Sequence, residues 1–217
     1  MSPDMITLLI KALGETIYMV VISMAVAAAI GIPLGVLLVT TARHQILECI
    51  PFNRVLAGIV NAVRSIPFII LMVAIIPFTR IVVGSSIGTT AAMVPLTIAA
   101  IPFIGRQVET SLREVPEGIV EAALSMGASP LQIIWHVYLP EAIPSIISQL
   151  TTVIIGLVGA SAMAGAIGGG GLGDLAIRYG YQRFRPEVML ATVIVLIILV
   201  QLVQFAGNVL AKRLNKK

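Results

Sequence analysis

Five stretches of the sequence are long and apolar enough to cross a lipid bilayer as helices. A helix rises about 1.5 Å per residue, so a span requires roughly 20 apolar residues. The stretches are 17–40, 55–76, 84–104, 143–166 and 188–206. The second carries Asn61 and Arg64 in its first half, and Pro95 and Pro102 interrupt the third. The sequence therefore predicts an all-α integral membrane protein with about five transmembrane helices.

The composition supports this class. Of the 217 residues, 58% are hydrophobic and 11% are charged, with a mean hydropathy of +1.05. These values are typical of polytopic membrane proteins rather than of soluble domains. The first apolar stretch continues well beyond the small residues at 25–29 that mimic a signal-peptide cleavage site, so we interpret it as a retained span.

A polar interval between the third and fourth stretches carries clear signals for two short helices. Pro116 suits a first helical turn, and Gly127 can adopt the left-handed conformation that stops a helix. Ser129 is a plausible N-cap, Pro130 takes the first helical position, and Gln132 completes a capping box.

Leu139-Pro140 is expected to end the second helix. Two short helices at a glycine corner, tethered between spans, would form a compact projection that fits a groove on a soluble partner.

The same residues carry a family resemblance. The pattern is Glu121-Ala122-Ala123, three residues, Gly127, nine residues, then Val137-x-Leu139-Pro140. It resembles the EAA loop of bacterial ABC importer permeases, which forms the coupling helix that docks on the ATPase subunit. The position of Val137 is usually Ile in that loop, which is a small change of volume.

The likeness extends over essentially the whole chain. The segments 64–68, 76–80, 94–106 and 168–173 resemble the permease subunits of bacterial methionine importers. The resemblance implies a type I ABC importer permease fold, with residues 1–217 as a single transmembrane domain and a coupling loop at about 116–140. The coupling residues would be Glu121, Ala122, Ala123, Gly127, Leu139 and Pro140.

The resemblance also implies partners. They are a second copy of the permease, two ATP-binding subunits that carry ATP and Mg, and an extracytoplasmic methionine-binding protein that selects the cargo. The chain would lie in membrane lipid of the bacterial inner membrane as a homodimer, without a cofactor of its own. Cargoes considered are methionine, D-methionine and related amino acids, or another small amino acid.

Basic residues indicate the orientation. Eight lie on the side of the first loop, the polar interval and the C-terminal tail, which ends in Lys212, Arg213, Lys216 and Lys217, and five lie on the other side. The positive-inside rule then places the C-terminus in the cytoplasm and the N-terminus outside. The net charge of +4 is scattered over span ends, so nucleic acid is not an expected partner.

Motifs for catalysis and for nucleotide binding are missing from the sequence. The two histidines, His44 and His136, are far apart and have no clustered metal ligands, and the only cysteine, Cys49, excludes an intrachain disulfide. Neither histidine lies in a predicted span, as a helix-borne catalytic base would require, and no lysine follows a glycine as a P-loop requires. The Gly-x-Gly-x-x-Gly match at 168–173 follows a span rather than a strand and is accidental. The chain is therefore expected not to be an enzyme.

The fourth stretch offers a candidate gate. Small residues recur there at spacings of three and four, which usually indicates close helix packing. Met163 is the only long side chain between Gly159 and Ala166, so it could close a pore or fill a gap in the bundle.

The predicted spans carry almost no charge at their middle, since Arg64, Arg80 and Arg106 fall toward span ends. Arg64 is expected to be structural and to be satisfied by helix-end carbonyls or by a loop acid. Without ionisable groups at the midplane, a stand-alone secondary transporter is the weaker alternative. Outside the membrane, Arg178, Tyr179, Tyr181 and Arg183 could contact a binding protein or anchor the chain at the bilayer surface.

Overall fold

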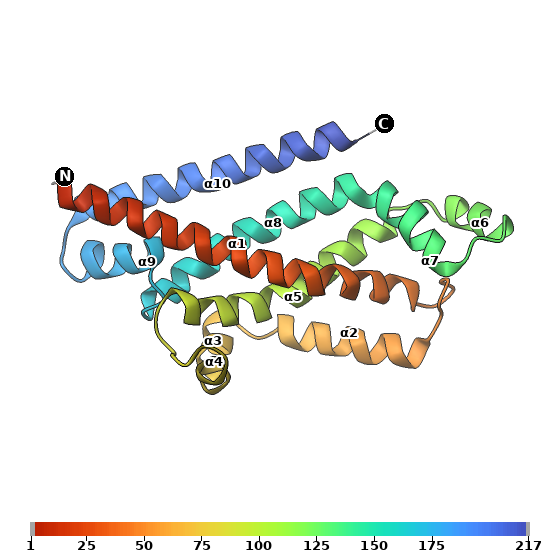
Figure 1. Cartoon of the computed structure of the whole chain (residues 1–217), viewed down its shortest axis with the longest axis horizontal. Coiled ribbons are helices and arrows are strands. Elements are labelled where there is room, and N and C mark those ends of the chain that lie inside the picture. The colour runs from red at the N-terminus through yellow and green to blue at the C-terminus, as the bar shows by residue number, and fades with distance from the viewer. Residues whose placement is uncertain (1–2, 216–217) are drawn as a thin grey trace. The chain divides into compact units, whose positions relative to one another are not determined.

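A computed structural model describes residues 3–215, and these residues form helices and connecting turns without a strand (Figure 1). Lys216 and Lys217, which contribute to the predicted orientation, lie outside the described residues. The α-helices are α1 (Pro3–Thr40), α2 (Ile50–Arg64), α3 (Phe68–Ala74), α4 (Ile76–Val83), α5 (Thr89–Arg113), α6 (Glu117–Ser125), α7 (Pro130–Ile133), α8 (Leu139–Ala166), α9 (Gly171–Leu175) and α10 (Pro186–Leu214). Two π-helices are η1 (Ile134–Tyr138) and η2 (Ala176–Tyr181).

The helices confirm the predicted membrane class. Four continuous helical stretches are long and apolar enough to span a bilayer, namely Met5–Thr40, Thr89–Arg113, Pro130–Ala166 and Pro186–Leu214. The pair α2 and α3 passes the same test only when both helices are taken together. By length and composition, the described residues therefore contain four candidate spans, or five if the broken pair counts as one.

Several helices differ from the sequence prediction. The first helix begins at Pro3 rather than near residue 17, and α5 continues through both Pro95 and Pro102. Prolines are tolerated in spanning helices where neighbouring groups satisfy the freed carbonyls. The predicted second span is not a single helix, because helical backbone is interrupted at residues 65–67 between α2 and α3. Pro67 disfavours helical backbone in the residue before it.

The described chain divides into two compact units, and each long helix contributes residues to both. Unit 1 comprises the described residues of Met1–Ala27, Ile66–Ala100 and Ile154–Gln204, and unit 2 those of Ala28–Ser65, Ile101–Val153 and Phe205–Lys217. Each unit has its own close packing and polar contacts.

In unit 1, small residues allow α9 to pack closely. A Cβ at Gly165 would lie 2.4 Å from the backbone nitrogen of Asp174, and a Cβ at Gly173 would lie 2.3 Å from the carbonyl oxygen of Ala162. The first turn of α9 is also anchored to α1, since the backbone N–H of Gly171 donates to Glu15 Oε2 (2.8 Å). The small residues of this region therefore serve close packing, as the sequence allowed.

In unit 2, α1 and α5 approach through glycines. A Cβ at Gly31 would lie 2.7 Å from the Ile104 side chain, and one at Gly35 would lie 2.6 Å from Val108. The amide of Asn53 at the start of α2 donates to the carbonyl of Leu38 (2.7 Å), which fixes the turn between α1 and α2. These contacts hold the elements from which the polar interval projects.

Candidate functional site

The polar interval of unit 2 forms the predicted glycine corner. Gly127 has a φ of +81°, in the left-handed region, directly after α6. Its N–H donates to the carbonyl of Leu124 (2.9 Å), and the N–H of Ala128 donates to the carbonyl of Ala123 (3.1 Å). This pair of bonds is a Schellman motif, and it satisfies carbonyls at the end of α6 that would otherwise be unpaired. The predicted left-handed conformation of Gly127 at the end of a helix is confirmed.

The capping box after the corner is also confirmed. The N–H of Gln132 donates to Ser129 Oγ (3.4 Å), and the N–H of Ser129 donates to Gln132 Oε1 (2.8 Å). Pro130 takes the first helical turn, where its missing N–H needs no partner. The direction of the second helix is thus fixed by side-chain contacts rather than by helix propensity alone.

The expected end of this second helix at Leu139-Pro140 is wrong. Helical backbone continues from Pro130 through η1 into α8, as far as Ala166. The wider π turn lies directly before Pro140, where the proline ring would clash with a carbonyl of a regular α turn. Of the two short helices predicted for the polar interval, α6 is separate, whereas the second is the beginning of a candidate span (Figure 1).

Large apolar side chains are exposed on both sides of the corner. The exposed fractions are 81% for Met126, 67% for Leu131 and 62% for Trp135. Glu121 is exposed as well, whereas Ala123 is only 6% exposed and packs within the chain. Of the two alanines in the motif, Ala122 is exposed and Ala123 is buried, so Ala122 is the one that a partner can contact. We call Glu121, Met126, Leu131 and Trp135 the corner surface.

A cavity lies beside α6, next to the corner surface. A cavity of about 420 Å³ lies between the 41–49 linker and α6, with Arg43, Arg113 and Glu121 among its lining residues. Tyr138 closes one side, and its hydroxyl donates to Gln45 Oε1 (2.6 Å). This bond ties the beginning of the long helix to the linker between α1 and α2.

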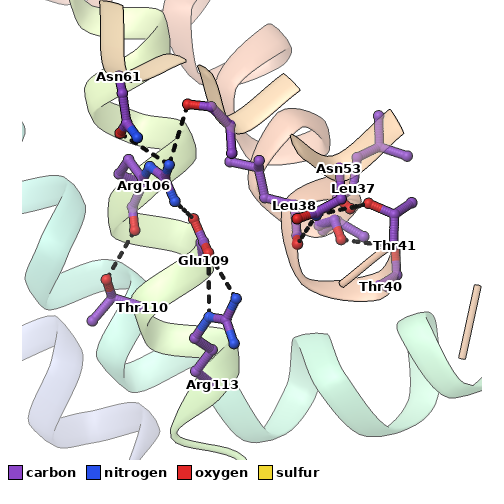
Figure 2. A network of polar contacts seen from close by, with 12 residues as sticks. Leu37, Leu38, Thr40, Thr41, Asn53, Asn61, Arg106, Glu109, Thr110 and Arg113 are labelled. Carbon is purple, nitrogen blue, oxygen red and sulfur yellow. Dashed lines mark hydrogen bonds and ion pairs between the residues drawn. The ribbon is translucent and has the colours of Figure 1, made fainter. Parts of the chain in front are cut away.

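A buried charge cluster joins α5 to α2 in the same unit. Glu109 is 7% exposed and accepts from Arg106 Nη1 (2.5 Å) and from Arg113 Nη2 (3.0 Å). Arg106 also donates to Asn61 Oδ1 of α2 (2.9 Å), as Figure 2 shows. Two guanidinium groups and an amide therefore fix the C-terminal third of α5, and the buried carboxylate is fully paired.

Arg64 is not satisfied as the sequence suggested. No hydrogen bond or ion pair of its side chain occurs among residues 3–215, with either a helix-end carbonyl or an acid. Its guanidinium carbon instead lies 5.0 Å from the ring centre of Phe103 on α5, and the side chain is exposed. Among the described side chains, the ring of Phe103 is therefore the group that contacts this charge.

In unit 1, one face of α8 is open. Met163 is 51% exposed, and no atom lies within 4 Å of a Cβ built on Gly156 or Gly159. These three positions recur at spacings of three and four, so they share one side of the helix. This side of α8 is exposed, whereas Gly165 on the same helix takes part in the close packing described above.

The segment after α9 uses two of its predicted contact residues internally. Arg178 pairs with Asp174, and the hydrogen bond and then the charge of that carboxylate raise the pKa of the guanidinium above its ordinary value. Arg183 lies over the ring of Tyr179, 4.5 Å from its centre. Tyr181 and Phe184 are the exposed apolar residues of this segment.

Sequence reasoning missed most of the corner surface. It selected Glu121 and Gly127 from the motif but not Met126, Leu131 or Trp135. Large apolar residues within a polar interval between spans were the available signal, because such residues rarely gather on a surface without a partner.

The chain is similar to known transport proteins. The family model "Binding-protein-dependent transport system inner membrane component" matches residues 31–217. A "Probable D-methionine transport system permease protein MetI" of Vibrio cholerae is 56% identical over 97% of this chain and 93% of its own length. The "D-methionine transport system permease protein MetI" of Escherichia coli K12 is 50% identical over 76% of each chain.

Solved structures agree with these relatives. A structure described as "Inward facing conformations of the MetNI methionine ABC transporter" has a TM-score of 0.98 and 47% identity, and all of both chains are covered. An amino acid ABC transporter with histidines has a TM-score of 0.78, covering 98% of this chain and 100% of its own. At 19% identity it shares the fold alone.

Proposed function

Because the chain belongs to the family of binding-protein-dependent transport system inner membrane components, we propose that it imports methionine as the permease subunit of an ABC transporter. The relatives that cover nearly its whole length are named as D-methionine permeases, and the matching structure is a methionine ABC transporter. It is a multi-pass inner membrane protein, and ATP hydrolysis belongs to a separate subunit. D-methionine and related amino acids are included in the proposed cargo range.

The corner surface is the proposed docking site for the ATPase. A rigid glycine corner with exposed Met, Leu and Trp side chains has the composition of a protein interface core, and Glu121 adds an acceptor for a partner Arg or Lys. This exposed apolar corner is the observation that carries the proposal. Coupling would then run through continuous helical backbone from Pro130 to Ala166, so movement of the ATPase reaches the middle of the membrane without a loop between.

The open face of α8 is the proposed lining of the passage. In a dimer, the open α8 faces of the two copies would line the passage together. Each copy would also offer one corner surface, so the dimer would bind two ATPase subunits. Met163 is the long side chain on that face and the proposed gate, since a flexible thioether can block a pore without locking it.

The outer segment is the proposed contact for an extracytoplasmic binding protein. Arg178 and Arg183 are held by Asp174 and Tyr179, so they present fixed charges beside the exposed Tyr181. Aromatic and Arg side chains are favoured at such interfaces. This assignment requires an outer location for 174–187 and a cytoplasmic location for the corner surface.

The docking proposal is tested by binding of purified ATPase to the permease in nanodiscs. Leu131→Asp and Trp135→Asp place a charge on the proposed interface, and each should weaken ATPase binding at least tenfold. Phe184→Asp, which changes an even more exposed apolar side chain in the other unit, is the control and should leave ATPase binding intact. ATPase binding that is unchanged in both corner variants would refute the docking site.

Methionine uptake by the complete complex, measured over a panel of amino acids, tests the cargo. We expect methionine to be taken up in preference to alanine, leucine and histidine. Preferred uptake of another small amino acid would retain the permease assignment and reject methionine.

A further inference from the structure

We propose that Arg64, supported by Phe103, binds the carboxylate of the amino acid cargo as it passes through the membrane, which rests on the proposed function. The site is an exposed guanidinium stacked on an aromatic ring, with no acid beside it. Its ligand class is the α-carboxylate of a small amino acid. The depth of Arg64, the engagement of the carboxylates in the spanning helices and the chemistry of the pair support this assignment.

Phe103 fixes the depth of the charge. At 1.5 Å per residue, Phe103 lies about 21 Å from the start of α5 at Thr89 and about 15 Å from its end at Arg113. The guanidinium of Arg64 is held 5.0 Å from that ring and therefore lies near the middle of a spanning helix. Arg64 is the last residue of α2, but the 15 residues of α2 are too few to cross a bilayer alone, so this helix end is not placed at the headgroups and the depth follows from the contact with α5.

No carboxylate of the described side chains forms an ion pair with Arg64. The four spanning helices carry Glu15, Glu109, Glu141 and Glu187. Glu109 binds two arginines, Glu15 accepts a backbone N–H of α9, Glu141 has an interaction of its own, and Glu187 is the second residue of α10. None of them forms an ion pair with Arg64.

A second copy of the chain does not readily supply a carboxylate that could pair with Arg64. It would bring the same four carboxylates, three of them already engaged and the fourth at a helix end. An intramembrane charge that is exposed and unpaired in this way marks a substrate path. The remaining source of a carboxylate at this depth is the cargo.

The chemistry of the pair suits an amino acid. A guanidinium presents a planar fork that binds a carboxylate through two parallel N–H donors. Stacking on Phe103 within the roughly 6 Å range of cation–π contact leaves the edge of the fork free for this. The exposed side chain of Phe103 adds an apolar surface for the side chain of the cargo.

A photoreactive, diazirine-bearing analogue of methionine tests the site on the assembled permease and ATPase complex in nanodiscs. Digestion and mass spectrometry then locate the label. We expect labelled peptides from α2 and α5, and we expect excess methionine, but not methioninamide, to suppress the label because the amide lacks the carboxylate.

Three variants complete the design. Arg64→Gln should reduce the label on α2 and α5 at least tenfold, whereas Arg64→Lys, which keeps the charge, should retain more label than Arg64→Gln. Arg80→Gln is the matched control, since Arg80 is an exposed arginine whose guanidinium donates to Ser86 within its own segment (3.3 Å). The control should label as wild type does.

Several results would overturn the proposal. These are wild-type labelling in Arg64→Gln, suppression by methioninamide equal to that by methionine, and no label on α2 or α5 in a complex that transports methionine. Dissociation of the Arg64→Gln complex into single permease chains would assign Arg64 to the subunit interface instead. A wild-type complex that does not transport methionine would reject the proposed function itself.

Discussion

At the scale of single residues, Gly127 connects sequence, local structure and function most directly. Its left-handed backbone permits the two bonds that close α6 and set the direction of the following helix. A β-branched residue in this conformation costs about 1 to 2 kcal/mol. Such a cost is enough to favour a different corner while the spans remain in the membrane.

Gly127→Val should therefore uncouple the permease. We expect normal membrane insertion, a large loss of transport, and either dissociation of the ATPase or ATP hydrolysis without cargo movement. Gly118→Val is the control, because Gly118 lies in α6 with no positive φ and no atom within 4 Å of a built Cβ. Wild-type stoichiometry, transport and substrate-linked hydrolysis in Gly127→Val would contradict the role of the corner.

The ion pairs of Glu109 lead us to expect that its substitution lowers the stability of the protein. It is buried and paired with both Arg106 and Arg113, so Glu109→Gln leaves two guanidinium groups without their carboxylate. Breaking one partner of a buried pair costs roughly 3 to 5 kcal/mol. We expect a clearly lower unfolding temperature in detergent, and no change for the exposed control Glu114→Gln. Equal unfolding temperatures for the two variants would show that the cluster contributes little.

At the scale of elements, the open face of α8 leads us to expect that substrate leaks through the permease when Met163 is shortened. Met163→Ala should assemble normally, since its neighbours on that face are already small, but it should raise substrate leak or ATP turnover without cargo. Met189→Ala removes a methionine that packs against Gly180 and should lower stability without a leak. If Met163→Ala lowers only thermal stability, its role is packing.

Elements differed in how far the sequence predicted them. Hydropathy gave the membrane class and the spans, and capping chemistry gave Gly127, Ser129 and Gln132, because these signals are local. The continuation through Pro140 was missed, since a π turn is a backbone adjustment without a sequence signal of its own.

The environment of Arg64 was missed for a different reason. Its neighbour Phe103 is distant in sequence, so no local pattern predicted their contact. Similarly, the burial of Ala123 depends on packing across the unit rather than on the motif that contains it. Tertiary contacts of this kind separate the residues that support the corner from those that are exposed for a partner.

At the scale of the whole molecule, the proposed functions require a particular topology. Reporter fusions should place 41–54, 106–140 and the C-terminal tail inside, and Asp4 and 168–187 outside. The reason is the distribution of basic residues at the span ends. An external signal from a fusion near Glu121 would rule out ATPase docking at the corner surface.

The central claim is that ATP drives cargo through this chain by way of a separate ATPase. The most direct measurement is methionine uptake into proteoliposomes that contain the permease, with the ATPase, the binding protein and ATP added singly and together. We predict uptake only when all components are present, and no response to a proton or sodium gradient. Uptake by the permease alone, driven by either gradient, would contradict this account and support a secondary transporter.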